Sequence, residues 1–439
     1  MKKSKYNIFI KDNDKTLCFN GLSGKVFSVE NEELKIIQGV LNSEKAQKMN
    51  VPLTMWLADN HFLEDENIDE KEQLLKKNRS EVFDDSYQLI LNPTLECNFR
   101  CWYCYEQHPE GHMSSLTMEK IKKYVNGLIE KDKIKDFSLG WFGGEPLLYF
   151  EEIVYPLSLH FKKIFSALDI PYSCNMTTNG YYIDREMINK FDEIDLRHFQ
   201  ITLDGDRETH NRTRNQQGEP SFDKILQNIV DLCSYLPKCD LLLRINFTNE
   251  IIAKDYKVIL APIPQQIRSQ IKIHFQRVWQ TAGNSENCRN DLIRNISNLR
   301  DVGFSVTPNN FYSFNRSHKC YADRYNYAHI NYDGKVYKCT ARNYSDVNSV
   351  GELEEEGLIK WKSGILEMMY AKPNFDNKEC IKCKLLPMCG GPCLQHKLDV
   401  NNGISKKNCN GKAKEIDIKS FIREYYLCVK KNHQMKLVR

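Results

Sequence analysis

Residues 87–104 read YQLILNPTLECNFRCWYC, an apolar stretch followed at once by three cysteines in a CxxxCxxC spacing. The apolar run Tyr87–Leu91 predicts a buried strand, and Cys97, Cys101 and Cys104 come just after its end. Three thiolates this close together can hold three corners of a cubane iron–sulfur cluster, because each thiolate binds a different iron. The fourth iron would then be open to a ligand that does not come from the protein.

A structural zinc ion is the alternative occupant of this motif. Zinc takes four protein ligands, usually supplied as two short pairs. The next candidate ligands are His108, four residues after Cys104, and His112, four residues further. Neither gives a usual zinc spacing, so we expect an iron–sulfur cluster.

The composition of the 439 residues is that of a globular protein, with 41% hydrophobic and 27% charged residues. The net charge of +4 is spread along the chain, and no basic block indicates a nucleic-acid partner. No stretch approaches the roughly 18 apolar residues of a membrane span, and the apolar patch near the first residue is too short for a signal peptide. We therefore expect a cytoplasmic protein with no nucleic-acid or membrane partner.

Sixteen cysteines are many for a cytoplasmic chain, in which disulfides are rare. Five stand alone and are expected to be buried small residues or surface thiols, namely Cys18, Cys174, Cys233, Cys239 and Cys288. The others form three groups that we interpret as metal ligands: Cys97, Cys101 and Cys104; Cys320 and Cys339; and Cys380, Cys383, Cys389, Cys393, Cys409 and Cys428.

From about residue 86, short apolar strands alternate with amphipathic helices. The expected strands are Tyr87–Leu91, Phe137–Phe142, Tyr172–Thr177, His198–Leu203, Leu241–Phe247 and Ile271–Val278. The expected helices lie near Thr117–Lys131, Glu151–Phe165, Arg185–Phe191, Phe222–Tyr235 and Glu286–Arg300. This alternation predicts an α/β fold with a parallel sheet, in which six βα units form a partial barrel. Sites in such folds lie at the carboxyl ends of the strands.

The two flanking regions follow other patterns. Residues 1–80 predict three strands (Tyr6–Ile10, Thr16–Phe19 and Lys25–Val29) followed by helices, a winged-helix order, with a simple covering domain as the alternative. After about residue 310 only Asp417–Lys430 is a clear helix, and metal clusters would have to supply the order. We expect domains at residues 1–80, 86–310 and 311–439.

The cysteine motif, with Tyr103 before its third cysteine, resembles the signature of the radical S-adenosylmethionine (SAM) superfamily. Three further motifs end the next three strands, where this family has them: WFGGEP at 141–146, TTNG at 177–180 and ITLDG at 201–205. Each alone is a weak turn signal, but motifs on four consecutive strands favour the family. The resemblance implies a partial (β/α)6 TIM barrel with a cluster that binds SAM at its open iron.

The resemblance also implies roles for individual residues. The three cysteines of the motif would hold the SAM-binding [4Fe–4S] cluster and act in catalysis, and Glu145 would bind the methionyl amine of SAM. Arg214 would pair with the SAM carboxylate, whereas we expect a structural hydrogen-bonding role for His210. The other expected cofactor-binding residues are Tyr103, Gly143, Gly144, Pro146, Thr178, Asn179, Thr202 and Asp204.

The C-terminal cysteines resemble the seven-cysteine SPASM pattern, which carries two auxiliary [4Fe–4S] clusters. By this resemblance the first cluster is held by Cys320, Cys339 and Cys393, and the second by Cys380, Cys383, Cys389 and Cys409. A zinc ribbon is the alternative for the 380–393 group. No eighth cysteine precedes Cys320 closely, so the first cluster is expected either to keep an open iron or to take Cys428 as a ligand.

Such a resemblance implies a peptide maturase of the kind that makes ribosomally synthesised, post-translationally modified peptides (RiPPs). An electron from a flavodoxin- or ferredoxin-type donor would cleave SAM to a 5′-deoxyadenosyl radical, which abstracts hydrogen from a precursor peptide. The expected product is a crosslink, foremost a thioether to cysteine, as in sactipeptide and ranthipeptide synthases. The winged-helix-like residues 1–80 would bind the leader of the precursor as an added strand.

Four alternatives differ in product or class. The first alternative is an enzyme that forms a C–C or cyclophane crosslink in the peptide. The second is an enzyme that makes another radical change in the peptide, such as epimerisation or decarboxylation. The third is an enzyme that oxidises a folded protein, as anaerobic sulfatase maturases do. Those maturases carry Asp directly after the cysteine that corresponds to Cys339, whereas this sequence has Thr340 there. The last alternative is a non-enzymatic iron–sulfur scaffold. DNA binding by residues 1–80 is disfavoured because no basic recognition helix is present.

Overall fold

The structure, a computed structural model, describes residues 1–131, 134–216, 218–281, 286–306, 320–371 and 377–405, together with 418, 419, 421–423, 425–427 and 429. The chain divides into two compact units. We call Asp84–Asn309 with Tyr325–Leu366 the barrel unit, and Met1–Phe83, Asn310–Arg324 and Glu367–Arg439 the terminal unit. Within the described ranges, no helix is long and apolar enough to span a membrane.

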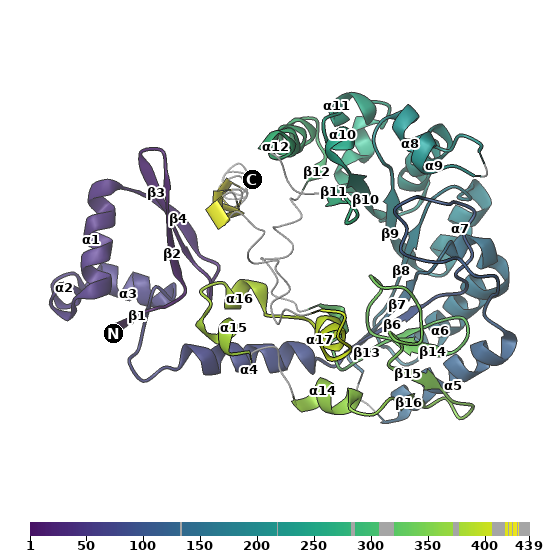
Figure 1. Cartoon of the computed structure of the whole chain (residues 1–439), viewed down its shortest axis with the longest axis horizontal. Coiled ribbons are helices and arrows are strands. Elements are labelled where there is room, and N and C mark those ends of the chain that lie inside the picture. Colours follow the sequence, from purple (N-terminus) through teal and green to yellow (C-terminus); the bar gives the residue numbers. More distant parts are fainter. Residues whose placement is uncertain are drawn as a thin grey trace. The chain divides into compact units, whose positions relative to one another are not determined.

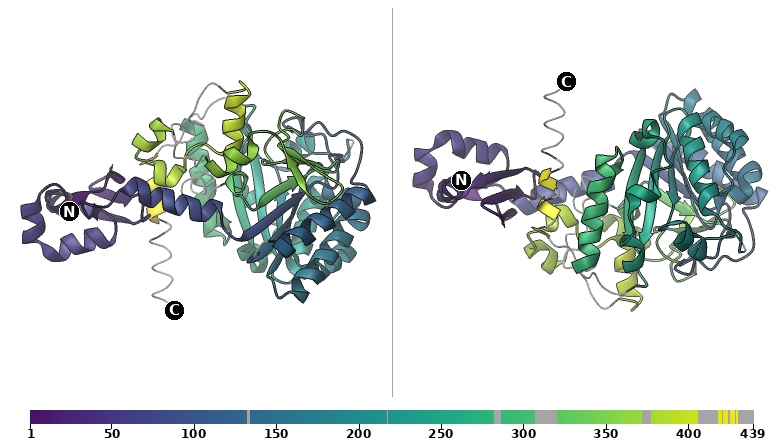
Figure 2. Two further views of the ribbon diagram at one scale, coloured as in Figure 1. Left: turned by 90° about the horizontal axis from the view of Figure 1, so that it is seen from below. Right: turned by 90° about the horizontal axis from the view of Figure 1, so that it is seen from above.

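The barrel unit is built on parallel strands with helices on the outer side of the curved sheet (Figures 1 and 2). Six strands pair in chain order: β6 Ser86–Leu91, β7 Asp136–Trp141, β8 Tyr172–Thr178, β9 Leu196–Thr202, β10 Asp240–Phe247 and β11 Ile271–Arg277. Their apolar residues are buried, as expected for strands covered on both faces. The predicted α/β partial barrel is confirmed.

Helices connect these strands. They are α5 Ser115–Lys131, η1 Pro146–Tyr149, η2 Phe150–Val154, α6 Tyr155–Ala167, α7 Arg185–Glu193, α8 Arg207–Thr213, α9 Phe222–Tyr235, α10 Asn249–Ile252, α11 Tyr256–Ile259, η3 Gln265–Gln270 and α12 Glu286–Asp301. The longer helices α5, α6, α7 and α9 each bury an apolar side. Helix α9 buries Phe222, Ile225, Ile229 and Leu232, which recur every three or four residues. The Asp184 carboxylate caps α7 by accepting from the Met187 amide.

The sheet continues beyond the six predicted strands on both sides. Strand β12 Ser305–Val306 pairs in parallel with β11, and β13 Tyr327–Ile330 pairs in parallel with β6. Strands β14 Lys335–Tyr337, β15 Gly351–Leu353 and β16 Ile359–Trp361 then follow in antiparallel order. The sequence did not predict β13–β16, because three or four residues are too few to show a periodicity. Residues 325–366 therefore lie with the barrel, and the three expected domains remain a prediction.

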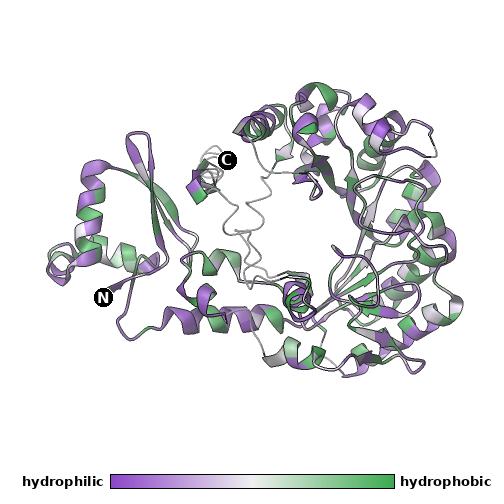
Figure 3. Ribbon diagram, viewed as in Figure 1, coloured by the Kyte–Doolittle hydropathy of each residue, from purple (hydrophilic) through white to green (hydrophobic). Residues whose placement is uncertain are grey.

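The terminal unit contains the strands and helices predicted for residues 1–80. Strands β2 Asn7–Asp12, β3 Lys15–Asn20 and β4 Val26–Glu30 form an antiparallel sheet, and β1 Lys2–Lys3 pairs with β5 Leu63–Glu64. The helices are α1 Asn31–Asn42, α2 Glu44–Met49, α3 Val51–Asp59 and α4 Glu70–Val82, the last of them mainly hydrophilic (Figure 3). Further along come η4 Tyr321–Asp323, α14 Ile365–Ala371, α15 Lys378–Lys382, α16 Leu386–Cys389 and α17 Leu394–Asn401.

Both faces of the sheet β2–β4 are covered. Alternate residues of a strand face opposite sides, so Cys18 packs with Val40 and Leu57 of α1 and α3. Its neighbours Leu17 and Phe19 pack on the other face with residues from the far end of the chain, among them Leu385, Met388, Phe421 and Ile422. The described residues from 418 to 429 are helical, which agrees with the predicted helix Asp417–Lys430.

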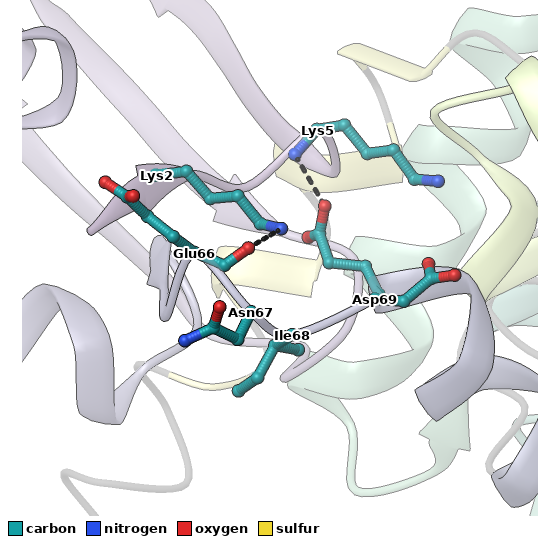
Figure 4. Close-up of a pocket in the computed structure, with 7 residues that line it drawn as sticks. Lys2, Lys5, Glu66, Asn67, Ile68 and Asp69 are labelled. Carbon is teal, nitrogen blue, oxygen red and sulfur yellow. Dashed lines mark hydrogen bonds between the residues drawn. The ribbon is translucent and has the colours of Figure 1, made fainter.

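An open polar pocket in the terminal unit is lined by Lys2, Lys5, Glu66, Asn67, Ile68, Asp69 and Glu70 (Figure 4). The Lys2 ammonium donates to the Glu66 carbonyl oxygen at 2.8 Å, and the Lys5 amide donates to the Glu70 carboxylate at 3.3 Å. These groups bind one another, and no residue expected to bind a cofactor lines the pocket.

Candidate cofactor site

The residues expected to bind the cofactor follow successive strands of the barrel unit. The cysteine loop follows β6 and Gly143–Pro146 follows β7. Thr178 is the last residue of β8 and Asn179 comes next, whereas Thr202 ends β9 and Asp204 follows two residues later. Because the carboxyl ends of parallel strands meet at one edge of a sheet, these segments converge there.

Two glycines let the loop after β7 lie directly against the cysteine loop. The Gly144 amide donates to the Thr94 carbonyl oxygen at 3.2 Å, and the Glu145 amide to the Glu96 carbonyl oxygen at 2.8 Å. A Cβ at Gly144 would overlap the Glu96 carbonyl oxygen, and one at Gly143, where φ is +104°, would overlap that of Thr94. Glycine is required because two backbones touch here. The motif alone did not reveal this reason.

The Glu145 carboxylate is fully buried and ties β7 to β8. It accepts hydrogen bonds from the Thr178 hydroxyl at 2.7 Å, the Asn179 amide at 2.7 Å and the Leu147 amide at 3.0 Å. Burial raises the pKa of Glu145, and these donors act in the opposite direction. A carboxylate offers roughly four lone-pair sites, so capacity for one further donor remains.

The three cysteines lie in an irregular loop whose backbone holds them. The Phe99 amide donates to the Cys97 sulfur at 3.4 Å, and the Cys104 amide donates to the Cys101 carbonyl oxygen at 2.9 Å. Burial raises the pKa of Cys97 to about 12 and of Cys104 to about 11, so a metal is needed to hold them as thiolates. Among the described residues, no group of three or more Cys, His, Asp or Glu side chains is placed so that it could hold a single metal ion. A cubane does not require that, because each thiolate binds its own iron.

A buried charged group joins the cysteine loop to β9 and β10. The Tyr103 hydroxyl donates to the Asp204 carboxylate, and it accepts from Arg214 Nη1 at 2.8 Å and from Asn246 Nδ2 at 3.2 Å. The backbone amide of Asn246 donates to Asp204 Oδ1 at 2.8 Å. The Arg214 guanidinium lies 3.7 Å from Asp204 Oδ2. Burial raises the pKa of Asp204, while the positive Arg214 lowers it. Asn246 was not predicted, because no motif marks it.

His210 fixes the backbone on either side of this group. Burial lowers the pKa of His210 to about 3, so its ring is neutral. Its Nδ1 accepts from the Asp204 amide at 3.1 Å, so Nε2 carries the hydrogen and donates to the Ser221 hydroxyl at 3.1 Å. Ser221 in turn donates to the Arg214 carbonyl oxygen at 2.5 Å. This is the hydrogen-bonding role expected for His210, with Ser221 as an unpredicted partner.

Two buried donors at this site have no hydrogen-bond partner among the described residues. They are Nε of Arg214 and Nδ2 of Asn98. A buried donor without an acceptor costs about 1–3 kcal/mol, so such groups normally bind a ligand, an ion or water. A carboxylate ligand would satisfy both donors, and an ammonium would use the free site on Glu145. The residues therefore fit an amino-acid group held beside the cysteine loop.

The expected auxiliary ligands are divided between the units. Cys339 belongs to the barrel unit, whereas Cys320, Cys393 and the 380–389 group belong to the terminal unit. Within the terminal unit, the Leu394 amide donates to the Asp323 carboxylate at 2.6 Å, which joins the segments next to Cys393 and Cys320. Cys409 and Cys428 lie outside the described residues. Both auxiliary ligand sets remain predictions.

Comparison with known proteins shows two relatives that match different shares of this chain. The radical SAM cyclopropyl synthase TigE of Paramaledivibacter caminithermalis is 24% identical over 456 aligned positions, which cover 89% of each chain. The cysteine-type anaerobic sulfatase-maturating enzyme of Clostridium novyi is 30% identical over 185 residues, 39% of this chain and 47% of that protein. The first three curated relatives are matched over only 32%, 33% and 47% of their own lengths.

A solved structure shares the fold. Native anSMEcpe, with bound AdoMet and the Cp18Cys peptide, superposes with a TM-score of 0.56 at 19% identity, covering 80% of this chain and 99% of that chain. The family model of the radical SAM superfamily matches residues 91–256, which begin at the end of β6 and include the cysteine loop, Glu145 and Arg214. Residues 91–256 are therefore a radical SAM domain.

Proposed function

We propose that this protein is a radical SAM maturase that modifies a ribosomally made precursor peptide. The observation that carries the proposal is the convergence of the cysteine loop with a buried carboxylate and buried unpaired donors. The extent of the match supports it further, since the relation to TigE covers 89% of both chains. The similar fold of anSMEcpe, solved with a peptide, is consistent with a peptide substrate.

In this proposal the chain positions the methionyl group of SAM. Glu145 accepts from the ammonium, and Arg214 pairs with the carboxylate while Tyr103 and Asp204 hold the guanidinium in place. The contact between Gly144 and the cysteine loop fixes the distance between these two sides of the site. When bound and reduced by one electron, the cluster and SAM supply methionine and a 5′-deoxyadenosyl radical.

The proposed product is a thioether crosslink. A carbon of the peptide loses a hydrogen atom to the radical, which leaves as 5′-deoxyadenosine. A cysteine thiol would lose its proton and its sulfur would bond to that carbon. The one remaining electron would need an acceptor, which an auxiliary cluster held by the C-terminal cysteines would supply. The auxiliary ligands are those proposed from the SPASM pattern, and the Asp323–Leu394 hydrogen bond supports the nearness of the Cys320 and Cys393 segments.

Formation of a C–C bond in the peptide is the second candidate function. The observation that favours it is the relation to TigE, which is named as a cyclopropyl synthase. Oxidation of a sulfatase is less supported, because Thr340 stands where those maturases carry Asp. The Thr340 carbonyl oxygen accepts from the Tyr105 hydroxyl at 2.5 Å, so this segment packs on the cysteine loop without supplying a carboxylate.

The terminal unit offers an edge for the leader of the precursor. Among the described strands β4 pairs with β3 alone, so the backbone groups on its outer edge are free to bind an added strand. Helix α3 exposes Met55 by 60% and Trp56 by 38%, and the Trp56 ring packs edge-on against Phe27 of β4, with 5.0 Å between centroids. We propose that the leader pairs with β4 and places apolar side chains against α3.

The function is tested by the mass of a partner peptide. The protein is co-expressed anaerobically with a short peptide gene encoded beside it, and the peptide is weighed before and after thiol alkylation. Loss of two hydrogens together with one alkylatable cysteine supports the thioether, whereas the same loss with every thiol still free supports the C–C bond. A cluster-loaded protein that releases no 5′-deoxyadenosine from SAM would show that it is not a radical SAM enzyme.

A further inference from the structure

Asn98, directly after the first cysteine of the loop, presents a buried amide donor that no motif explains. Its Nδ2 has no hydrogen-bond partner among the described residues, although its Oδ1 accepts from Asn179 Nδ2 at 2.7 Å. Each unpaired buried donor in a folded protein calls for a physical reason, because leaving it unpaired is unfavourable.

The orientation of this amide is fixed by a backbone group. The Tyr181 amide donates to Asn179 Oδ1 at 2.9 Å, so the nitrogen of the Asn179 side chain must be the end that faces Asn98. That nitrogen is a donor, and therefore the oxygen of Asn98 must face it. Turning the Asn98 amide over would bring two donors together. The unpaired atom of Asn98 is thus its nitrogen.

The neighbours of Asn98 indicate what this nitrogen binds. On one side, Asn179 donates its backbone amide to Glu145 Oε2 at 2.7 Å, the carboxylate proposed to hold the ammonium of SAM. On the other side, the Arg214 guanidinium lies over the ring of Phe99, 5.9 Å from its centroid, and its Nε is also unpaired. The site therefore combines one carboxylate with two free donors, which complements the ammonium and carboxylate of an α-amino acid.

We infer that the Asn98 side-chain amide donates a hydrogen bond to the α-carboxylate of the methionyl group of SAM, beside Arg214. The inference rests on the proposed function only for the identity of the ligand. Arg214 supplies the charge, and Asn98 adds a directed neutral donor. Because Asn179 ties Asn98 to Glu145, the two ends of the amino-acid group are held at a fixed separation.

The test compares two ligands in two proteins. Dissociation constants for SAM and for decarboxylated SAM are measured by anaerobic equilibrium dialysis with the oxidised, cluster-loaded full chain, with no peptide present. Asn98→Asp keeps the oxygen that faces Asn179 and replaces the donor with an acceptor. We expect Asn98→Asp to weaken SAM binding by roughly 10- to 100-fold and to leave the affinity for decarboxylated SAM unchanged.

Two other results would overturn the inference. One is an equal loss, or no loss, for both ligands. The other is a shifted midpoint potential of the cluster without SAM, measured by electron paramagnetic resonance, with unchanged SAM affinity; the donor would then face a cluster sulfur. If Asn98→Asp loads no iron, Asn98→Ser replaces it in the same comparison.

A matched control is Asn295→Asp in α12, which has no hydrogen bond to a residue proposed to bind SAM. The Asn295 side chain is fully buried, and its Nδ2 already donates to the carbonyl oxygens of Ile252 and Lys254. We expect this variant to lower the unfolding temperature without changing SAM affinity. Since peptide is absent throughout, a failure of the proposed peptide modification would not alter these results.

Discussion

At the scale of single residues, hydrogen bonds hold the site together. A backbone amide determines which side-chain atoms in this chain of bonds donate and which accept. The Asp204 amide sets the tautomer of His210, and His210 sets the hydroxyl of Ser221, which donates to the Arg214 carbonyl oxygen. The Arg214 backbone is therefore positioned through the side chains of His210 and Ser221.

Removal of one hydroxyl tests this arrangement. In Ser221→Ala the hydrogen on His210 Nε2 loses its acceptor, which costs about 1–3 kcal/mol of unfolding free energy. We also expect roughly three- to tenfold weaker SAM binding, because Arg214 is less firmly placed. Ser158→Ala is the control, since the buried Ser158 accepts from Trp141 Nε1 and has no hydrogen bond to His210 or Arg214. Equal SAM affinities in the two variants would contradict a positioning role.

Buried neutral histidines make stability depend on pH. Burial lowers the pKa values of His210 and His329 to about 3, below the ordinary value of about 6.5. The unfolded chain therefore binds more protons than the folded one between these values, so unfolding free energy falls as the pH drops below about 6.5. Each histidine contributes about 1.4 kcal/mol per pH unit in that range. Urea unfolding of His329→Gln at pH 7 and pH 5.5 should show a smaller loss than that of the original protein; an identical loss would be contrary to this account.

Motifs predict the side chains that we propose to carry chemistry, but they do not predict the side chains that hold them in place. The cysteines, Glu145 and Arg214 could be predicted because their spacing follows the chain. Asn246 and Ser221 could not, because their roles depend on which backbone group comes near, and that depends on the folded sheet. The same is true of the free donor on Asn98.

At the scale of elements, the contact between two loops determines whether the cysteine loop is in place. Gly144→Ala would put a Cβ onto the Glu96 carbonyl oxygen, so the two backbones must separate. We expect loss of the SAM-binding cluster, seen as about four fewer irons per chain. Gly127→Ala in α5 is the control, because a Cβ there meets nothing within 4 Å and alanine favours a helix by about 0.5–1 kcal/mol. Full iron content in Gly144→Ala would refute the argument.

The edge of β4 is a second element whose role can be tested alone. Trp56→Ala removes the ring beside Phe27, and we expect a leader peptide to bind roughly tenfold more weakly, as measured by fluorescence anisotropy. SAM cleavage without peptide should be unchanged, because that site lies in the barrel unit. Leu116→Ala, which removes another exposed apolar side chain, serves as the control. Unaltered leader binding in Trp56→Ala would exclude this edge.

Elements in which apolar residues recur with a clear helix or strand periodicity could be predicted from the sequence, and the others could not. Strand β10 and helix α9 have the expected bounds within two residues, because eight and fourteen residues show their period. Strand β13 has four residues and pairs with β6 across more than 200 positions of sequence, so only the folded sheet reveals it.

At the scale of the whole molecule, compact units do not follow the order of the chain. The terminal unit combines Met1–Phe83 with Glu367–Arg439, and its core requires both. Phe421 is buried and packs edge-on against Phe19, with 6.3 Å between ring centroids.

This core predicts a selective effect of substitutions near residue 420. Phe421→Ala should cost about 3–5 kcal/mol, because it leaves a cavity against β3. Leu427→Ala, in the same helical segment but 49% exposed, should cost less than about 1 kcal/mol. Hydrogen exchange of the β2–β4 amides would report the difference, and equal protection in both variants would rule out a shared core.

The covering of β3 by residues near 421 also bears on how the protein is made. Strands β2 to β4 leave the ribosome early, whereas residues 418–429 follow almost 400 residues later. At roughly 5–20 residues per second this delay is about 20 to 80 seconds. Throughout it, Ile10, Leu17 and Phe19 lack their final cover, so the nascent chain carries an exposed apolar surface until residues 418–429 have been made.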